Sequence, residues 1–208
     1  MKLLSFLLVL LSGSLVAGGP PAARVMLSPL TKAAYAAALK QQVLTKPQVT
    51  YPLKKQRGRI SIPTTAGVKV FRDRGMGTDD LEQAQYEYAG YWPQFKQHVV
   101  VAHLWEHTDY LLIAASGQQL VLPASPQFGP GLQRFVVASA GIEYAVLPNV
   151  IQLFGWQNGG FAKVWETTPE TWEPEQVAWA AANALVLRKR TWTNAGEAGY
   201  GYARLTIR

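Results

Sequence analysis

One six-residue phrase occurs three times between residues 97 and 181, and this repeat constrains the fold more than any other feature. Each copy begins with Gln, continues through mostly apolar residues and ends in Ala, and each follows an aromatic residue and a Pro. The copies are Gln97–Ala102 (QHVVVA), Gln133–Ala138 (QRFVVA) and Gln176–Ala181 (QVAWAA). Their terminal alanines lie 36 and then 43 residues apart. A period of about 40 residues with several short strands per unit is typical of a repeated β-meander, which indicates an architecture and no particular chemistry.

The pattern around these phrases predicts a mainly β domain over residues 59–208. Apolar and polar residues alternate there, and turn residues recur every few positions, so neighbouring strands are expected to be antiparallel. The repeat units are expected at about 92–127, 128–171 and 172–208. A propeller normally has at least four blades. Three units therefore predict a small or partial propeller-like array, with the strands before residue 92 as an irregular fourth blade, or alternatively a β-sandwich.

Part of this domain resembles a known repeat family. The turn Phe128–Gly131 before Gln133–Ala138 is similar to the Ser-Pro-Asp-Gly turn that opens blades in WD-repeat-like β-propellers of the bacterial periplasm, although the Ser and the Asp are missing here. The order of Tyr110–Ile113, Ile151–Leu153 and Val164–Glu166 resembles a group of uncharacterised exported bacterial proteins. The resemblance covers residues 86–207, and it implies a fold and a compartment but no activity.

The N-terminus has the order of a secretory signal peptide. Lys2 precedes the apolar run Leu3–Leu11, and small residues follow as far as Gly19. This run is shorter than the ~20 apolar residues that span a bilayer. We therefore expect a signal peptide at 1–18, a periplasmic or secreted protein, and no transmembrane span after cleavage. Because the chain has no cysteine, it has no lipid-modified N-terminal Cys, and we expect it to be released.

Residues 19–58 form a basic segment, in which we expect one helix at about 29–45. Ser28 and Pro29 suit a helix start, and Lys46–Pro47 suits its end. From Gly18 to Arg72 the chain has ten basic residues and no acidic ones. Such a segment favours a solvated arm; the alternatives are docking on the mildly acidic remainder of the chain or on an anionic envelope surface. Nucleic acid is not an expected partner, because an exported protein rarely meets it.

A zinc-peptidase motif occurs once. His103, Glu106 and His107 match H-x-x-E-H, in which two histidines one helical turn apart bind zinc and the glutamate activates water. The flanking residues predict a strand, a turn and a strand, and on an extended strand the two histidines would lie about 13 Å apart at ~3.3 Å per residue. The sequence therefore predicts no metal or other cofactor, and a zinc-dependent hydrolase is the alternative.

The tryptophans are the remaining candidates for a ligand site. Trp92, Trp105, Trp156 and Trp172 are expected near strand ends or turns, where a ring either fills the space between units or faces outward to stack on a sugar or peptide. These patterns favour an exported, non-catalytic β-repeat protein that binds a ligand or associates with the envelope.

Overall fold

The computed structural model describes residues 23–75, 77, 81–143, 145–192 and 196–208, which are mostly β-strand. They form three four-stranded antiparallel sheets and one hairpin, so the predicted mainly β class is confirmed. The first sheet contains β4 (Ala84–Trp92), β5 (Gln97–Leu104), β6 (Thr108–Ala114) and β7 (Gln119–Leu122). The second contains β8 (Gln127–Phe128), β9 (Arg134–Ser139), β10 (Val150–Gln157) and β11 (Gly160–Thr167). The third contains β12 (Glu173–Ala181), β13 (Ala184–Trp192), β14 (Ala198–Ile207) and β1 (Val25–Leu30). The hairpin is β2 (Arg59–Thr64) and β3 (Gly67–Arg72).

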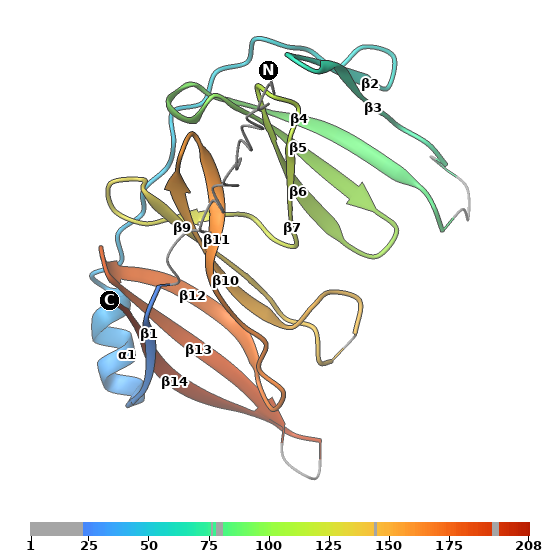
Figure 1. The fold of residues 1–208 in the computed structure, drawn as a ribbon. Helices are drawn as coiled ribbons and strands as arrows, with labels where there is room; N and C mark the ends of the chain where they lie inside the picture. Colours follow the sequence, from blue (N-terminus) through green and yellow to red (C-terminus); the bar gives the residue numbers. More distant parts are fainter. Residues whose placement is uncertain (1–22, 76, 78–80, 144, 193–195) are drawn as a thin grey trace, which may run out of the picture.

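The sheets stack face to face, with the hairpin at one end and helix α1 (Lys32–Leu39) at the other (Figure 1). An apolar layer separates each pair of neighbours. The hairpin packs on the first sheet, the first sheet on the second, the second on the third, and the third on α1. Each four-stranded sheet is therefore covered on both faces, as in a sandwich with added layers.

The repeated phrases encode strands that are buried on both faces. In β9, Phe135 points into the layer shared with the first sheet, whereas the next residue, Val136, points into the layer shared with the third. In β12, Trp179 faces the second sheet and Ala178 faces α1. Successive strand residues point to opposite faces, so a run without polar residues fits a strand between two apolar layers.

The third copy of the phrase does not occupy the same place as the other two. The first and second copies form β5 and β9, each the second strand of its sheet, but the third copy lies in β12, the first strand. The sheets span 84–122, 127–167 and 173–207, so β4 belongs with β5 to β7, although the predicted first unit begins at residue 92. The phrase therefore occurs in strands that are buried on both faces, but it does not always occupy the same position in a sheet.

The N-terminal helix is shorter than the predicted 29–45. Ser28 and Pro29 lie in β1, which pairs with β14 from Val25 opposite Ile207 to Leu30 opposite Tyr202. Pro is tolerated there because β1 is an edge strand. These residues therefore pair with the edge of β14 and do not join the helix. The helix cap is instead Thr31, whose hydroxyl accepts a hydrogen bond from the Ala34 amide at 3.1 Å.

Residues 42–58, which we call the strap, run along one side of the stack (Figure 1). The Val43 amide donates to the Trp179 carbonyl of the third sheet, Thr45 bridges to Phe128 of the second, and Thr50 bridges to Tyr91 of the first. The strap therefore lies against β12, β8 and β4, the edges that unpaired sheets would leave open. Sequence reasoning favoured a solvated arm here, but the structure places these residues against all three sheets.

Neither helical segment of the described residues, α1 or the 3-10 helix η1 (Pro93–Phe95), has the length and apolar run needed to cross a bilayer. The expected signal peptide at 1–18 lies outside the described residues.

Candidate functional site

Two of the four candidate tryptophans lie in the core between the first and second sheets. Trp92 is 7% exposed, with its ring centroid 5.2 Å from that of Phe128 in an edge-to-face arrangement. Trp156 packs its ring 4.9 Å from Phe95 and 4.8 Å from Phe161. Such contacts between rings add stability beyond the area they bury. These two rings therefore hold sheets together and do not form an outward stacking surface.

The other two candidate tryptophans lie apart from this core. Trp105 is 43% exposed in the turn between β5 and β6. Trp172 packs against the layer between the second and third sheets, and the Lys189 ammonium lies 5.3 Å from its ring centroid. Trp105 and Trp172 thus lie apart from each other and from the pair Trp92 and Trp156, so the four rings do not converge on one ligand.

The zinc-like motif lies on the β5–β6 hairpin, as the strand–turn–strand pattern predicts. His103 is in β5, and its Nε2 lies 3.5 Å from Glu87; His107 is in the turn, with Nε2 3.8 Å from Asp109. The two imidazoles have separate carboxylate partners. Within the described residues, no group of three or more metal-ligating side chains converges.

A cavity of about 380 Å³ lies where the strap meets the three sheets, and we call it the strap cavity. It lies within the usual size range of small-molecule sites, about 300–1,000 Å³. The strap lines one wall with Gln42, Val43, Leu44, Thr45, Lys46 and Pro47. The sheets and the β7–β8 connection line the rest with Ala89, Trp92, Val99, Tyr110, Ser125, Pro126, Gln127, Phe128 and Trp179.

The lining of the strap cavity is mostly aromatic and aliphatic, and its polar side chains are those of Gln42, Thr45, Lys46, Ser125 and Gln127. The indole of Trp179 donates from Nε1 to the Gln127 carbonyl at 2.8 Å, so the ring is fixed and its polar atom is already satisfied. Gly129 allows this approach, because a Cβ there would lie 2.9 Å from the Trp179 ring. At the rim, the apolar side chains of Val43 and Leu44 are 37% and 77% exposed. This arrangement can hold an apolar or aromatic group.

None of the lining residues is Asp, Glu or His. Proton transfer and nucleophilic activation commonly use such side chains. Lysine, tyrosine and serine can also serve in such steps, and Lys46, Tyr110 and Ser125 line the cavity. Of the candidate residues from the sequence, only Trp92 lines this cavity; Trp179 and the strap were missed, and the only available signal was the position of Trp179 inside the third repeated phrase.

An ion pair and two hydrogen bonds hold the C-terminal part of the strap against β4. Lys55 Nζ lies 2.5 Å from the Asp73 carboxylate and donates to the Tyr86 carbonyl at 2.7 Å, while the Tyr86 amide donates to Asp73 at 2.9 Å. Burial raises the pKa of Asp73, but these hydrogen bonds, chiefly that from Lys55, outweigh it and hold the pKa below its ordinary value. Asp73 thus stays ionised and keeps the strap in place.

The strap crosses β4 at Gly90. The strap and β4 exchange two backbone hydrogen bonds here. The Thr50 amide donates to the Tyr91 carbonyl at 2.9 Å, and the Tyr91 amide donates to the Thr50 carbonyl at 2.7 Å. Gly90 has φ +116°, and a Cβ there would lie 2.4 Å from Val49 Cγ1 and 3.0 Å from the Thr50 carbonyl oxygen. Only glycine fits this crossing without strain.

Beside this crossing, Tyr88 and His98 form a partly buried polar pair. The Tyr88 hydroxyl lies 2.9 Å from Nδ1 of His98, and the Tyr91 ring packs 4.7 Å from the imidazole. Burial, with a smaller contribution from Tyr91, raises the pKa of Tyr88 to about 12. Burial also lowers the pKa of His98. Both groups therefore favour their neutral forms near pH 7.

A second cleft, of about 530 Å³, opens between the first and second sheets. Its lining includes the carboxamides of Gln97, Gln118, Gln119, Gln157 and Asn158. The strap and the third sheet contribute nothing to its lining. We therefore take the strap cavity, which all three sheets and the strap build together, as the candidate site.

The comparisons with known proteins give no relative: the chain matches no family model, no curated protein and no solved structure.

Proposed function

We propose that this chain is an exported, non-catalytic binding module that takes a small apolar or aromatic ligand, or an apolar side chain, into the strap cavity. The signal-peptide pattern at 1–18 supports export. The blade-like, propeller-like repeat supports a scaffold for binding. The observation that carries the proposal is the cavity itself, with its buried rings and its exposed apolar rim.

The alternative from the sequence, a zinc-dependent hydrolase, has less support. His103 and His107 lie on a hairpin and pair with Glu87 and Asp109 respectively. Metal analysis of the purified protein separates the two functions. Our proposal expects no stoichiometric zinc and no difference in metal content between the wild type and His103→Ala. One zinc per chain that disappears in His103→Ala would favour the hydrolase.

A neutral fluorescent probe, N-phenyl-1-naphthylamine, tests the strap cavity. Because the probe has no charge, the basic segment does not attract it. We expect saturable binding with one site per chain, and a loss of at least tenfold in affinity in Val99→Phe. Val99 is 4% exposed and lines the cavity, so a phenyl group there would occupy the ligand's space.

Val70→Phe is the matched control, because Val70 is 43% exposed on β3 and does not line the strap cavity. It should bind the probe as the wild type does. Circular dichroism and thermal unfolding must show that both variants remain folded. Equal probe affinity in the wild type and a folded Val99→Phe would refute the cavity as the site.

A further inference from the structure

A further cavity lies at the α1 end of the stack, and it shares no lining residue with the strap cavity. It has a volume of about 390 Å³ and lies between α1 and the outer face of the third sheet. Its lining residues are Lys32, Tyr35, Ala36, Leu39 and Lys40 from α1, with Arg188 from β13 and Tyr202 from β14.

The floor of this cavity is apolar and firmly held. The rings of Tyr35 and Tyr202 pack with centroids 4.8 Å apart, and the Tyr35 hydroxyl donates to Gln176 at 2.9 Å. Tyr35 is 5% exposed and belongs to the core between α1 and the third sheet. With Ala36 and Leu39, these rings form a surface that suits hydrocarbon.

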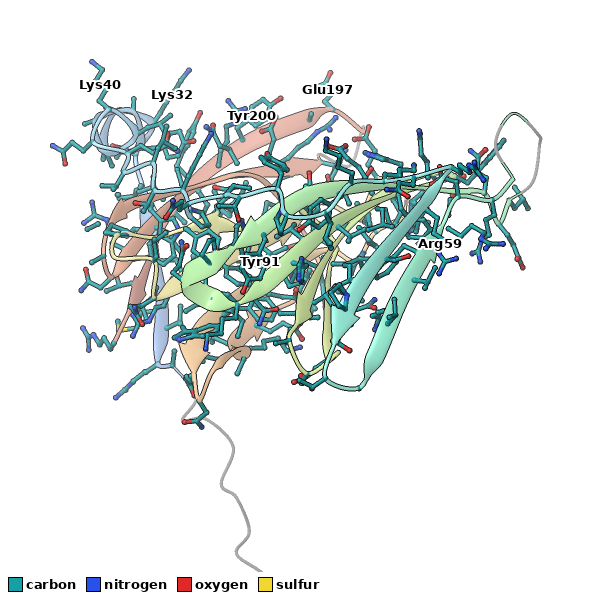
Figure 2. All side chains as sticks on the ribbon, turned by 90° about the horizontal axis from the view of Figure 1, so that it is seen from above. Lys32, Lys40, Arg59, Tyr91, Glu197 and Tyr200 are labelled. Atoms are coloured by element: carbon teal, nitrogen blue, oxygen red, sulfur yellow. The ribbon has the colours of Figure 1, made fainter. Side chains whose placement is uncertain are left out.

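The rim of the cavity is basic. Lys32 and Lys40 are both exposed, and both project from α1 at the edge of the molecule seen in Figure 2. Their positions on the helix are eight residues apart, which corresponds to about 12 Å along the axis. Neither lysine has an ion-pair partner among the described residues, whereas the third cation, Arg188, pairs with Glu175 at 2.8 Å. No carboxylate lines the cavity.

The same face of the third sheet continues this mixture of cations and rings. Arg188 lies 5.5 Å from the ring centroid of Tyr200, which is 54% exposed, and Arg190 lies 5.6 Å from that of Trp192. Figure 2 shows Tyr200 on the same side of the molecule as the two lysines of α1. Lysine or arginine beside tyrosine and tryptophan is the composition found where proteins meet a lipid–water interface.

We infer that this end of the molecule docks on an anionic lipid membrane, with a lipid phosphate between Lys32 and Lys40 and the first acyl carbons on Tyr35, Leu39 and Tyr202. A second protein of acidic character would satisfy the lysines, but it would not need the apolar floor. The inference goes beyond the proposed ligand of the strap cavity, since the two cavities share no lining residue.

Vesicle sedimentation tests this docking with the full mature chain. Vesicles of phosphatidylglycerol mixed with phosphatidylcholine should carry the wild type down, and vesicles of phosphatidylcholine alone should not. The double variant Lys32→Glu, Lys40→Glu should bind the anionic vesicles at least about tenfold more weakly, because each basic residue near an anionic surface contributes measurably to attachment.

Lys54→Glu, Arg72→Glu is the matched control. It changes the net charge by the same amount, and both residues are exposed outside the two cavities. It should bind almost as well as the wild type. Equal losses in the two double variants would mean that overall charge, and not this cavity, attracts the vesicles, and the inference would fail.

A competition experiment distinguishes lipid from free phosphate. Inorganic phosphate at the concentration of accessible headgroups should leave the protein on the vesicles, since it cannot reproduce the acyl contact. Release by phosphate would show an anion site without lipid specificity and would overturn the assignment. Probe binding in the strap cavity is measured without vesicles, so either proposal can fail while the other stands.

Discussion

The three sheets and the N-terminal segment (residues 23–72) stabilise the molecule in different ways. The sheets interdigitate large apolar side chains across two continuous layers. The N-terminal segment adds few buried residues of its own, chiefly Tyr35 and Ala38 in α1 and Ile60, Ile62 and Phe71 in the hairpin. It caps the two ends of the stack and covers strand edges through β1 and the strap. Repeats that bury their faces only against neighbours need such caps at their ends.

The charged residues also differ between the N-terminal segment and the sheets. No acidic residue occurs between Gly18 and Arg72, and Lys55 pairs with Asp73, the first acidic residue after this stretch. Ion pairs such as Arg190 with Glu143 at 2.6 Å and Lys163 with Glu166 at 2.7 Å lie within the sheets and their connections. Among the described residues, Lys163, Arg188 and Arg190 of the sheets have carboxylate partners, whereas Lys55 is the one cation before Asp73 that has such a partner.

The largest expected effect tests whether the sheets carry more of the stability than the N-terminal segment. Phe135→Ala should lower the free energy of unfolding by about 3–5 kcal/mol. Phe135 is fully buried and packs against the rings of Phe128, Phe154 and Phe161.

Phe71→Ala in the hairpin is the matched change and should cost less, because Phe71 is 8% exposed and packs against one ring, that of Tyr86. Urea unfolding of both variants measures the difference. Equal losses of unfolding free energy in the two variants would contradict the view that the sheets carry more of the stability, since the hairpin would then contribute as much to the core as β9 does.

A medium effect tests how closely the strap fits the first sheet. Gly90→Ala and Gly67→Ala place the same methyl group at nearly the same φ, +116° and +115°, but a Cβ at Gly67 would have no neighbour within 4 Å. Backbone strain of about 1–3 kcal/mol is expected in both variants. Gly90→Ala should lose a further ~1–3 kcal/mol, the usual cost of overpacking, because the strap must move.

Thermal unfolding measures both glycine variants, and amide hydrogen exchange at Thr50 and Tyr91 shows whether the strap has separated from β4. If the two variants lose equal stability and the Thr50 and Tyr91 amides stay protected in both, the strap does not depend on this crossing.

The smallest expected effect concerns pH. Because burial lowers the pKa of folded His98, the unfolded chain binds more protons as the pH falls below about 6.5, the ordinary histidine pKa. The stability that neutral His98 contributes is therefore present above that pH and is lost on acidification. The melting temperature of the wild type should fall between pH 7.5 and 5.5 more than that of His98→Gln. His103→Gln, on the same strand, is the control; the idea fails if His98→Gln follows the wild-type profile.

Sequence reasoning predicted the sheets because their pattern is local. A residue such as Val136 lies next to Phe135 in a strand buried on both faces, and an apolar run without breaks reports this burial directly. The hairpin placement of His103 and His107 followed from the same pattern, since strand residues flank both. The sequence could not predict between which sheets Trp92 and Trp156 lie, because the position of a ring near a strand end does not show which sheet packs against it.

The N-terminal segment was predicted poorly because its structure depends on distant edges. Ser28 and Pro29 have the composition of a helix start, yet they pair with β14 at the other end of the chain. The strap has no periodicity of its own, and its course is set by contacts with the sheets, among them the bridges at Thr45 and Thr50. The strap cavity arises from this path, so no local pattern could indicate it.

The sequence by itself determined which residues become strands, because short apolar stretches between turn residues are a local pattern. Only the tertiary structure decided the order of the layers, the course of residues 42–58 and the two cavities. Those depend on which edge or face is left uncovered after the sheets have formed, and that is a property of the assembled stack.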